Sequence, residues 1–189
     1  MEQKETVTKQ KSFFRELIEI IFFVAVIVIP IQTFVGRTFI VIGNSMFPTF
    51  ENKDYLIVDK LTYHFKAPSR GDVIVFHPPI NEKTYYIKRV IGLPGETVIV
   101  KKNEVTIINE AFPEGVTLEQ PYASSLGESE SNLTLKADEY FVMGDNRAVS
   151  SDSRVWGILP KENISGRAFM RLYPFTKIDI WPGALEQSI

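Results

Sequence analysis

The hydrophobic pattern of the chain changes once, near residue 35. Residues Leu17 to Val35 read LIEIIFFVAVIVIPIQTFV, an apolar stretch whose single charge is Glu19. As a helix with a rise of ~1.5 Å per residue, this stretch would measure about 28 Å, close to the ~30 Å of a bilayer's hydrocarbon core. The pattern therefore predicts a transmembrane helix over residues 17–35, with a buried core helix or a cleaved secretory signal as the alternatives.

The residues around this stretch indicate how it would lie in a membrane. Its last residues are large and form no A-x-A-like cleavage site, which favours an uncleaved signal anchor. Positive charge is concentrated on its N-terminal side: Lys4, Lys9, Lys11 and Arg15 precede it, whereas only Arg37 and Lys53 follow within the next 18 residues. By the positive-inside rule, residues 1–16 form a cytoplasmic tail, and residues 36–189 lie outside the cytoplasmic membrane, which the chain crosses once.

Beyond Val35 the pattern consists of short apolar or alternating runs that are separated by turn residues, which is typical of β-strands. All 11 glycines and 10 of the 11 prolines lie in this part of the chain. This punctuation favours an antiparallel sheet or barrel over βαβ units, and we expect a mainly β domain. The predicted strands are residues 38–42, 55–59, 72–76, 85–93, 97–100, 105–108, 140–143, 167–172 and 178–180.

One part of this domain lacks periodicity. Residues 109–135 are polar and contain Pro113-Glu114-Gly115 and then the run SSLGESES from Ser124 to Ser131. Such composition is typical of a surface loop. We therefore expect a loose, mobile insertion over residues 109–135.

Composition excludes several classes of function. The chain has no cysteine, so it has neither a thiol nucleophile nor a thiolate metal site. Its two histidines, His64 and His77, do not show metal-ligand spacing. A net charge of −2 with 44% hydrophobic residues is typical of a folded domain and not of a basic nucleic-acid-binding protein. The candidates for chemistry are therefore serine, threonine, lysine and the carboxylates.

Ser45 and Lys88 are the first two candidates. Ser45 lies in the turn-forming stretch GNSMFPT, ten residues after Val35, and a serine there is by itself typical of a turn. Lys88 lies in a predicted strand, where alternation places it on one face with Tyr86 and Val90. A strand lysine is commonly a solvated edge residue, but burial of that face would lower its pKa from ~10.4 toward neutrality. A neutral amine close to Ser45 would then take the hydroxyl proton, as in Ser–Lys catalysis.

A third segment, Gly144 to Arg154, reads GDNRAVSSDSR and by itself is typical of a hydrogen-bonded loop with an Asp–Arg pair. Together and in this order, the segments resemble those of the bacterial type I signal peptidases. Residues 44–49 resemble the family's nucleophile box, 70–76 its structural strand, 86–95 its lysine box and 144–154 its last box. With one predicted span, the chain is similar to the single-anchor forms typical of Gram-positive bacteria.

The resemblance implies a role for individual residues. Ser45 would be the nucleophile and Lys88 the general base, with the Ser150 hydroxyl orienting the lysine amine. Asp152 would pair with both Arg154 and Arg89 as a scaffold. Signal peptides end in A-x-A-like sequences, so the family's substrate pockets are shallow and apolar. The residues implied to line those pockets are Phe39, Val41, Met46, Phe50, Tyr86 and Ile87.

The sequence departs from the family pattern in the oxyanion region. Many members carry a hydroxyl residue two positions before the nucleophile, and this chain has Gly43 there. The oxyanion would then be bound by backbone amides such as that of Ser45. Gly43 is either a missing hydroxyl or a residue required for its backbone angle. We expect the former, because relatives with Ser or Thr accept a Cβ at this position.

The sequence therefore predicts a membrane-anchored serine endopeptidase that cleaves signal peptides from exported preproteins after small residues. No metal or organic cofactor is implied. The expected partners are preproteins and the lipid bilayer, with the secretion translocon as a further candidate and no nucleic acid. Two alternatives stay open: a Ser–Lys peptidase that matures one pilus or conjugation component, and a catalytically silent anchored module that holds exported peptides.

Overall fold

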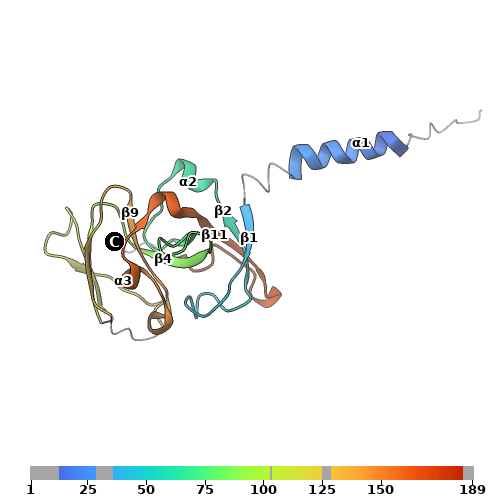
Figure 1. Ribbon diagram of the computed structural model, residues 1–189. Helices are drawn as coiled ribbons and strands as arrows, with labels where there is room; N and C mark the ends of the chain where they lie inside the picture. The colour runs from blue at the N-terminus through green and yellow to red at the C-terminus, as the bar shows by residue number, and fades with distance from the viewer. Residues whose placement is uncertain (1–12, 29–35, 103, 125–128, 185–189) are drawn as a thin grey trace, which may run out of the picture. The chain divides into compact units, whose positions relative to one another are not determined.

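The computed structural model describes residues 13–28, 36–102, 104–124 and 129–184 (Figure 1). The chain divides into two compact units, residues 1–35 and residues 36–189. The second unit contains all of the β structure that is described.

The first unit is helical over its described residues. Helix α1 spans Phe13–Phe23, and a π-helical segment, η1, continues it over Val24–Val28. None of the α1 side chains is buried, and Glu19 accepts a hydrogen bond from Arg15 Nε one helical turn earlier, at 3.2 Å. Residues 29–35, which complete the predicted span, lie outside the described residues. Within those that are described, no helix combines the length and the apolar character needed to cross a bilayer.

The second unit is built on a large sheet in which every pairing is antiparallel (Figure 1). From one edge to the other, its strands are β1 (Gly36–Ile40), β2 (Tyr55–Asp59), β11 (Ile164–Tyr173), β3 (Val73–Phe76), β4 (Tyr86–Gly92), β9 (Glu139–Met143) and β10 (Leu159–Pro160). Strand β12 (Asp179–Ile180) pairs with β11 beside this path. The mainly β, antiparallel prediction is confirmed, and the described strands form an open path from β1 to β10.

A smaller antiparallel sheet contains β7 (Val116–Thr117), β6 (Glu104–Ile108), β5 (Thr97–Lys101) and β8 (Ser131–Thr134), in that order. Strands β7 and β8 fall inside residues 109–135, so the prediction of a loose insertion is wrong for those strands. Leu118 and Leu135, which are close to them in sequence, are buried in the core. These strands are too short to show periodicity in the sequence, and backbone pairing to β6 and β5 defines them. Residues 125–128 of the predicted insertion lie outside the described residues.

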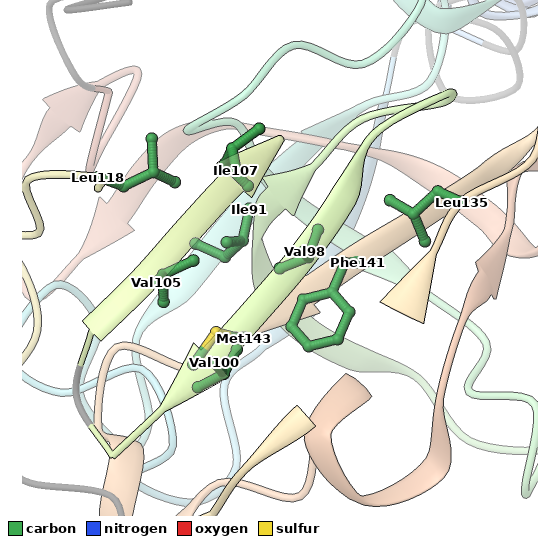
Figure 2. Packing of buried hydrophobic residues seen from close by; sticks show 9 residues of the cluster. All are labelled: Ile91, Val98, Val100, Val105, Ile107, Leu118, Leu135, Phe141 and Met143. Carbon is green, nitrogen blue, oxygen red and sulfur yellow. The ribbon is translucent and has the colours of Figure 1, made fainter. Parts of the chain in front are cut away.

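The two sheets share a hydrophobic core (Figure 2). Alternation along β5 and β6 directs Val98, Val100, Val105 and Ile107 inward, where Figure 2 shows them around Ile91, Phe141 and Met143 of the large sheet. Short helical segments connect the strands: α2 (Thr62–Phe65), η3 (Arg147–Val149), α3 (Ser153–Trp156), η4 (Lys161–Asn163) and η5 (Phe175–Lys177).

Strand β4 is covered on both faces, and this determines the environment of its charged residues. All residues from Lys88 to Gly92 are buried, whereas the strand begins with the half-buried Tyr86 and Ile87. A lysine in the centre of this strand is therefore removed from water. This is the condition under which the sequence predicts a lowered lysine pKa.

Candidate active site

Ser45 and Lys88 are in contact in the second unit, although they are 43 positions apart in the sequence. Ser45 lies in the turn that follows β1, and Lys88 projects from β4. Lys88 Nζ donates hydrogen bonds to Ser45 Oγ at 2.8 Å and to the carbonyl oxygen of Ile87 at 2.9 Å. The same Nζ lies 5.2 Å from the centre of the Tyr86 ring, on the face that alternation predicted. The structure therefore brings together the two residues that the sequence paired.

Burial controls the charge of the lysine. Lys88 is 4% exposed, and this desolvation lowers its pKa from 10.5 to about 8, against the opposing effect of the carboxylates of Asp152 and Asp145. An appreciable fraction of the amine is therefore neutral near physiological pH. A neutral amine in contact with a serine hydroxyl can accept its proton.

The turn that carries Ser45 is held from its other side by Asn146. The backbone N–H of Asn146 donates to the Ser45 carbonyl oxygen at 3.0 Å, and its side-chain Nδ2 donates to the Asn44 carbonyl oxygen at 3.1 Å. The Ser45 backbone N–H itself donates no hydrogen bond within the described part of the chain. An unpaired amide beside the nucleophile can bind a developing oxyanion.

Gly43 has a backbone conformation that few other residues adopt. Its φ is +96°, in the left-handed region, and its N–H donates to Asn52 Oδ1 at 3.1 Å. A Cβ built on Gly43 meets nothing within 4 Å, so space would permit a larger residue although the backbone angle disfavours one. Our expectation that this position readily accepts a Cβ is therefore wrong, because the strain lies in the backbone.

An open cleft of about 640 Å³ leads to the Ser45–Lys88 pair. Four of the six residues predicted to form substrate pockets line it: Phe39, Val41, Tyr86 and Ile87. The other two, Met46 and Phe50, do not line the cleft. They are 1% and 0% exposed and pack in a hydrophobic cluster with Leu56 and Val73. These two residues therefore belong to the core that supports the nucleophile turn.

Arg89 forms a buried ion pair, but its partner is Asp145 and not the predicted Asp152. Nε and Nη2 of Arg89 donate to the two carboxylate oxygens of Asp145 at 2.8 and 2.7 Å, and both side chains are 0% exposed. Nη1 donates to the carbonyl oxygens of Gly71 and Gly183, and the Thr49 hydroxyl donates to the same carboxylate at 2.5 Å. The prediction that Arg89 pairs with Asp152 is therefore wrong, because Asp145 already occupies the fork of the guanidinium.

Asp152 does pair with Arg154, as predicted. The Arg154 Nε and Nη2 groups each donate to this carboxylate at 2.8 Å, and the backbone N–H of Gly144 donates to it at 3.0 Å. Burial alone would raise the pKa of Asp152, but the Arg154 guanidinium and the Gly144 amide hold it below its ordinary value. Asp152 therefore stays ionised close to Lys88.

The lysine-orienting role of Ser150 stays a prediction. Its buried Oγ lies beside Gly144 and near Asp152, but it has no partner in hydrogen-bonding geometry within the described residues. The orienting contact that Lys88 does make is with the carbonyl oxygen of Ile87.

Sequence reasoning missed several residues that shape this site. Asp145 and Asn146 lie in a segment that the sequence analysis singled out, but nothing in that segment indicated which carboxylate would pair with Arg89. Nothing in the sequence around Asn52 indicated a role in the site, because its contact with Gly43 depends on how the loop folds. No group of three or more metal-ligating side chains occurs within the residues that the structure describes.

A serine hydroxyl that contacts a buried lysine amine, beside a free backbone amide and an open apolar cleft, is the arrangement that Ser–Lys hydrolysis requires, and here it stands on an antiparallel β scaffold. Residues 14–173 match the family described as "Signal peptidase, peptidase S26". The chain belongs to this family of serine endopeptidases, which cleave signal peptides from preproteins.

Relatives from several bacteria are also signal peptidases. The signal peptidase I of Leptolyngbya laminosa is 42% identical over 163 residues, covering 81% of this chain and 76% of that protein. The signal peptidase I P of Bacillus subtilis subsp. natto is 34% identical over 178 residues, covering 90% and 95% respectively. A crystal structure of a signal peptidase I from Enterococcus faecalis is 32% identical and covers 54% of this chain and 97% of that one, with a TM-score of 0.45.

The backbone angle of Gly43 predicts that two substitutions will have similar effects. Gly43→Ala and Gly43→Ser should each lower kcat/KM about tenfold, because forcing a Cβ into the left-handed region costs about 1–2 kcal/mol and favours displacement of the turn. Gly43→Asn, which tolerates this region better, should lose less. Peptide cleavage assays check this, with thermal melts to confirm folding. A Gly43→Ser variant at least as fast as the wild type would contradict it.

The buried pair predicts a large loss of stability when one partner is removed. Arg89→Met leaves the Asp145 carboxylate buried without its cation and should lower the free energy of unfolding by about 3–5 kcal/mol. Urea unfolding in detergent measures the change, with the exposed Arg37→Met as the matched control. The double variant Arg89→Met/Asp145→Asn should recover part of the loss. A loss below about 1 kcal/mol for Arg89→Met would show that the pair is not a structural requirement.

Proposed function

We propose that Ser45 is the nucleophile and Lys88 the general base of a Ser–Lys dyad that cleaves preproteins after small residues. The observation that carries the proposal is the 2.8 Å contact between the buried Lys88 Nζ and the half-buried Ser45 Oγ at the open cleft. A catalytically silent module that only holds exported peptides does not require this contact, whereas a Ser–Lys hydrolase does.

The chemistry follows from the two protonation states of Lys88. In the neutral state, the serine hydroxyl donates to the lone pair of Nζ and transfers its proton while Oγ attacks the scissile carbonyl carbon. The negative charge that develops on the carbonyl oxygen is bound by the free N–H of Ser45. The lysine ammonium then protonates the departing amine, which leaves an acyl-enzyme. Water, deprotonated by the same amine, attacks the ester carbon. The bond between Oγ and that carbon then breaks, the ammonium returns its proton to Ser45 Oγ, and the signal peptide is released with a free carboxylate.

The position of the amine is fixed by groups around Lys88. The Ile87 carbonyl oxygen accepts one of its N–H groups, so the lone pair of the neutral amine is free to point toward Ser45. The carboxylates of Asp152 and Asp145 stabilise the ammonium that forms during the reaction. We propose that Ser150, whose buried hydroxyl lies close to Asp152, also orients the lysine amine.

The cleft supports cleavage after small residues. It runs along β1, which is an edge strand whose outer backbone groups can pair with an extended peptide. Its apolar walls include the side chains of Phe39, Val41 and Ile87. We propose that these side chains narrow the pockets so that only small substrate residues fit.

The topology of the chain is also a proposal. The basic residues that precede the apolar segment support a cytoplasmic N-terminus, and the unburied apolar side chains of α1 support contact with a lipid bilayer. The catalytic unit then faces the outer side of the cytoplasmic membrane, where exported preproteins emerge from the translocon.

The lowered lysine pKa predicts the pH profile of the reaction. Because only the neutral amine acts as the base, kcat/KM should rise about tenfold per pH unit below pH 8 and level off above an apparent pKa of about 8. Lys88→Arg should be inactive, because a guanidinium does not lose its proton in a protein. Cleavage of a preprotein on a gel measures both, with Ser45→Ala as the inactive control. Substantial turnover by Lys88→Arg would refute the dyad.

The orientation can be tested with cysteine labelling, because the natural chain has no cysteine. We expect Ser129→Cys, at an exposed position of the catalytic unit, to react with a membrane-impermeant maleimide added to intact spheroplasts. Lys4→Cys should react only after lysis. Labelling of Lys4→Cys and protection of Ser129→Cys in intact spheroplasts would reverse the proposed topology.

A further inference from the structure

A second, shallower hollow begins where the cleft ends. It measures about 460 Å³ and is lined by Asn44, Phe47, Glu51, Asn52 and Asn146. Asn44 lines both this hollow and the cleft, and it directly precedes the nucleophile. The two hollows are therefore neighbours at the Ser45 end of the cleft.

The lining residues show that the second hollow adjoins the turn that carries Ser45. One wall of the cleft is formed by consecutive residues from Phe39 to Ser45, and the hollow is lined mainly by residues that follow Ser45. Asn146, which also lines the hollow, holds the carbonyl oxygens of Ser45 and Asn44. The hollow thus lies beside the turn of Ser45 and, apart from Asn44, is lined by residues that do not line the cleft.

An endopeptidase must accommodate substrate on both sides of the bond that it cuts. The apolar cleft accounts for the acyl side, which is the signal peptide. On the far side of Ser45, the chain that leaves as an amine needs a path of its own, and this hollow is in the position to provide it.

The chemistry of the hollow matches a peptide backbone. Carboxamides offer both donors and an acceptor, as a peptide group does. Asn44 and Asn52 are exposed, and since Asn52 Oδ1 accepts from Gly43, its NH₂ donors face no protein partner within the described residues. The Glu51 carboxylate is paired with Lys177 at 2.7 Å, so its charge is largely balanced. Phe47, which is 44% exposed, adds an apolar surface.

We infer that this hollow binds the first residues of the leaving chain through their backbone, with the side chains of Asn44 and Asn52 as the hydrogen-bonding groups. The inference rests on the proposed function. It assigns the two sides of the substrate to different kinds of recognition: side-chain size before the cut, and the peptide backbone after it. An enzyme that releases many different mature sequences can use the backbone because every sequence has one.

Two synthetic substrates test the inference. Both carry the same signal-side sequence; one ends in a single leaving residue as its amide, and the other has four leaving residues. The wild type should cleave the longer peptide with about tenfold higher kcat/KM, as expected for one or two additional hydrogen bonds. The measured quantity is the ratio of the two kcat/KM values, because a change in the dyad itself affects both peptides equally.

Two variants and one control distinguish a role in substrate binding from a purely structural role. Asn52→Asp keeps an oxygen that accepts from the Gly43 amide and removes the NH₂ donors, and Asn44→Ala removes the other carboxamide. Each should lower the ratio at least threefold, whereas Asn132→Asp, an exposed carboxamide on β8 of the smaller sheet, should leave it unchanged.

The outcomes distinguish the inference from the function on which it rests. A wild-type ratio near one, or an unchanged ratio in both Asn44→Ala and Asn52→Asp, would overturn the leaving-side site while the peptidase assignment stands. If the wild type cleaves neither peptide, or Ser45→Ala cleaves both, the Ser–Lys function itself is wrong and the inference fails with it.

Discussion

The buried ion pair of Arg89 with Asp145 is the contact on which the arrangement of the site depends. It joins β4, the loop after β9, the nucleophile turn through Thr49, and the C-terminal segment through Gly183. Desolvating two charges is expensive, and the bidentate geometry together with the extra hydrogen bonds to carbonyl oxygens offsets that cost. Lys88 is the neighbour of Arg89 in β4, so the backbone that carries Lys88 is held in place by the residue beside it.

Lys88 and Arg89 are adjacent cationic residues of β4, and burial affects them differently. The guanidinium of Arg89 donates to one carboxylate and to two carbonyl oxygens, which offset the cost of its burial. The Lys88 amine donates to a hydroxyl and a carbonyl oxygen, and no carboxylate of the described residues accepts from it, so desolvation prevails and the pKa of the amine falls. The identity of the two residues matters as much as their position: a guanidinium stays protonated in the interior of a protein, whereas an ammonium loses its proton when it is poorly compensated.

The sequence predicted the parts of this molecule that depend on local pattern. The alternation in Tyr55–Asp59 defines β2 with the same bounds as in the structure, and the family resemblance identified the contact between Ser45 and Lys88. It did not predict features that depend on three-dimensional placement. Asp145 and Asp152 lie in the same short segment, and only the fold decides which one meets Arg89. Met46 and Phe50 are apolar residues near the nucleophile, and their sequence is equally compatible with a pocket wall and with the core.

The hydrogen bond between Arg89 and the carbonyl oxygen of Gly183 has a consequence for the order of folding. The two residues are 94 positions apart, and β11, which must pair with both β2 and β3, lies between them in sequence. During synthesis, β4 with Lys88 and Arg89 therefore emerges long before Gly183, which is the last partner of Arg89. Because contacts of such long range form slowly, the support of β4 is completed late. A chain interrupted before Gly183 contains both Ser45 and Lys88 but lacks this hydrogen bond of Arg89.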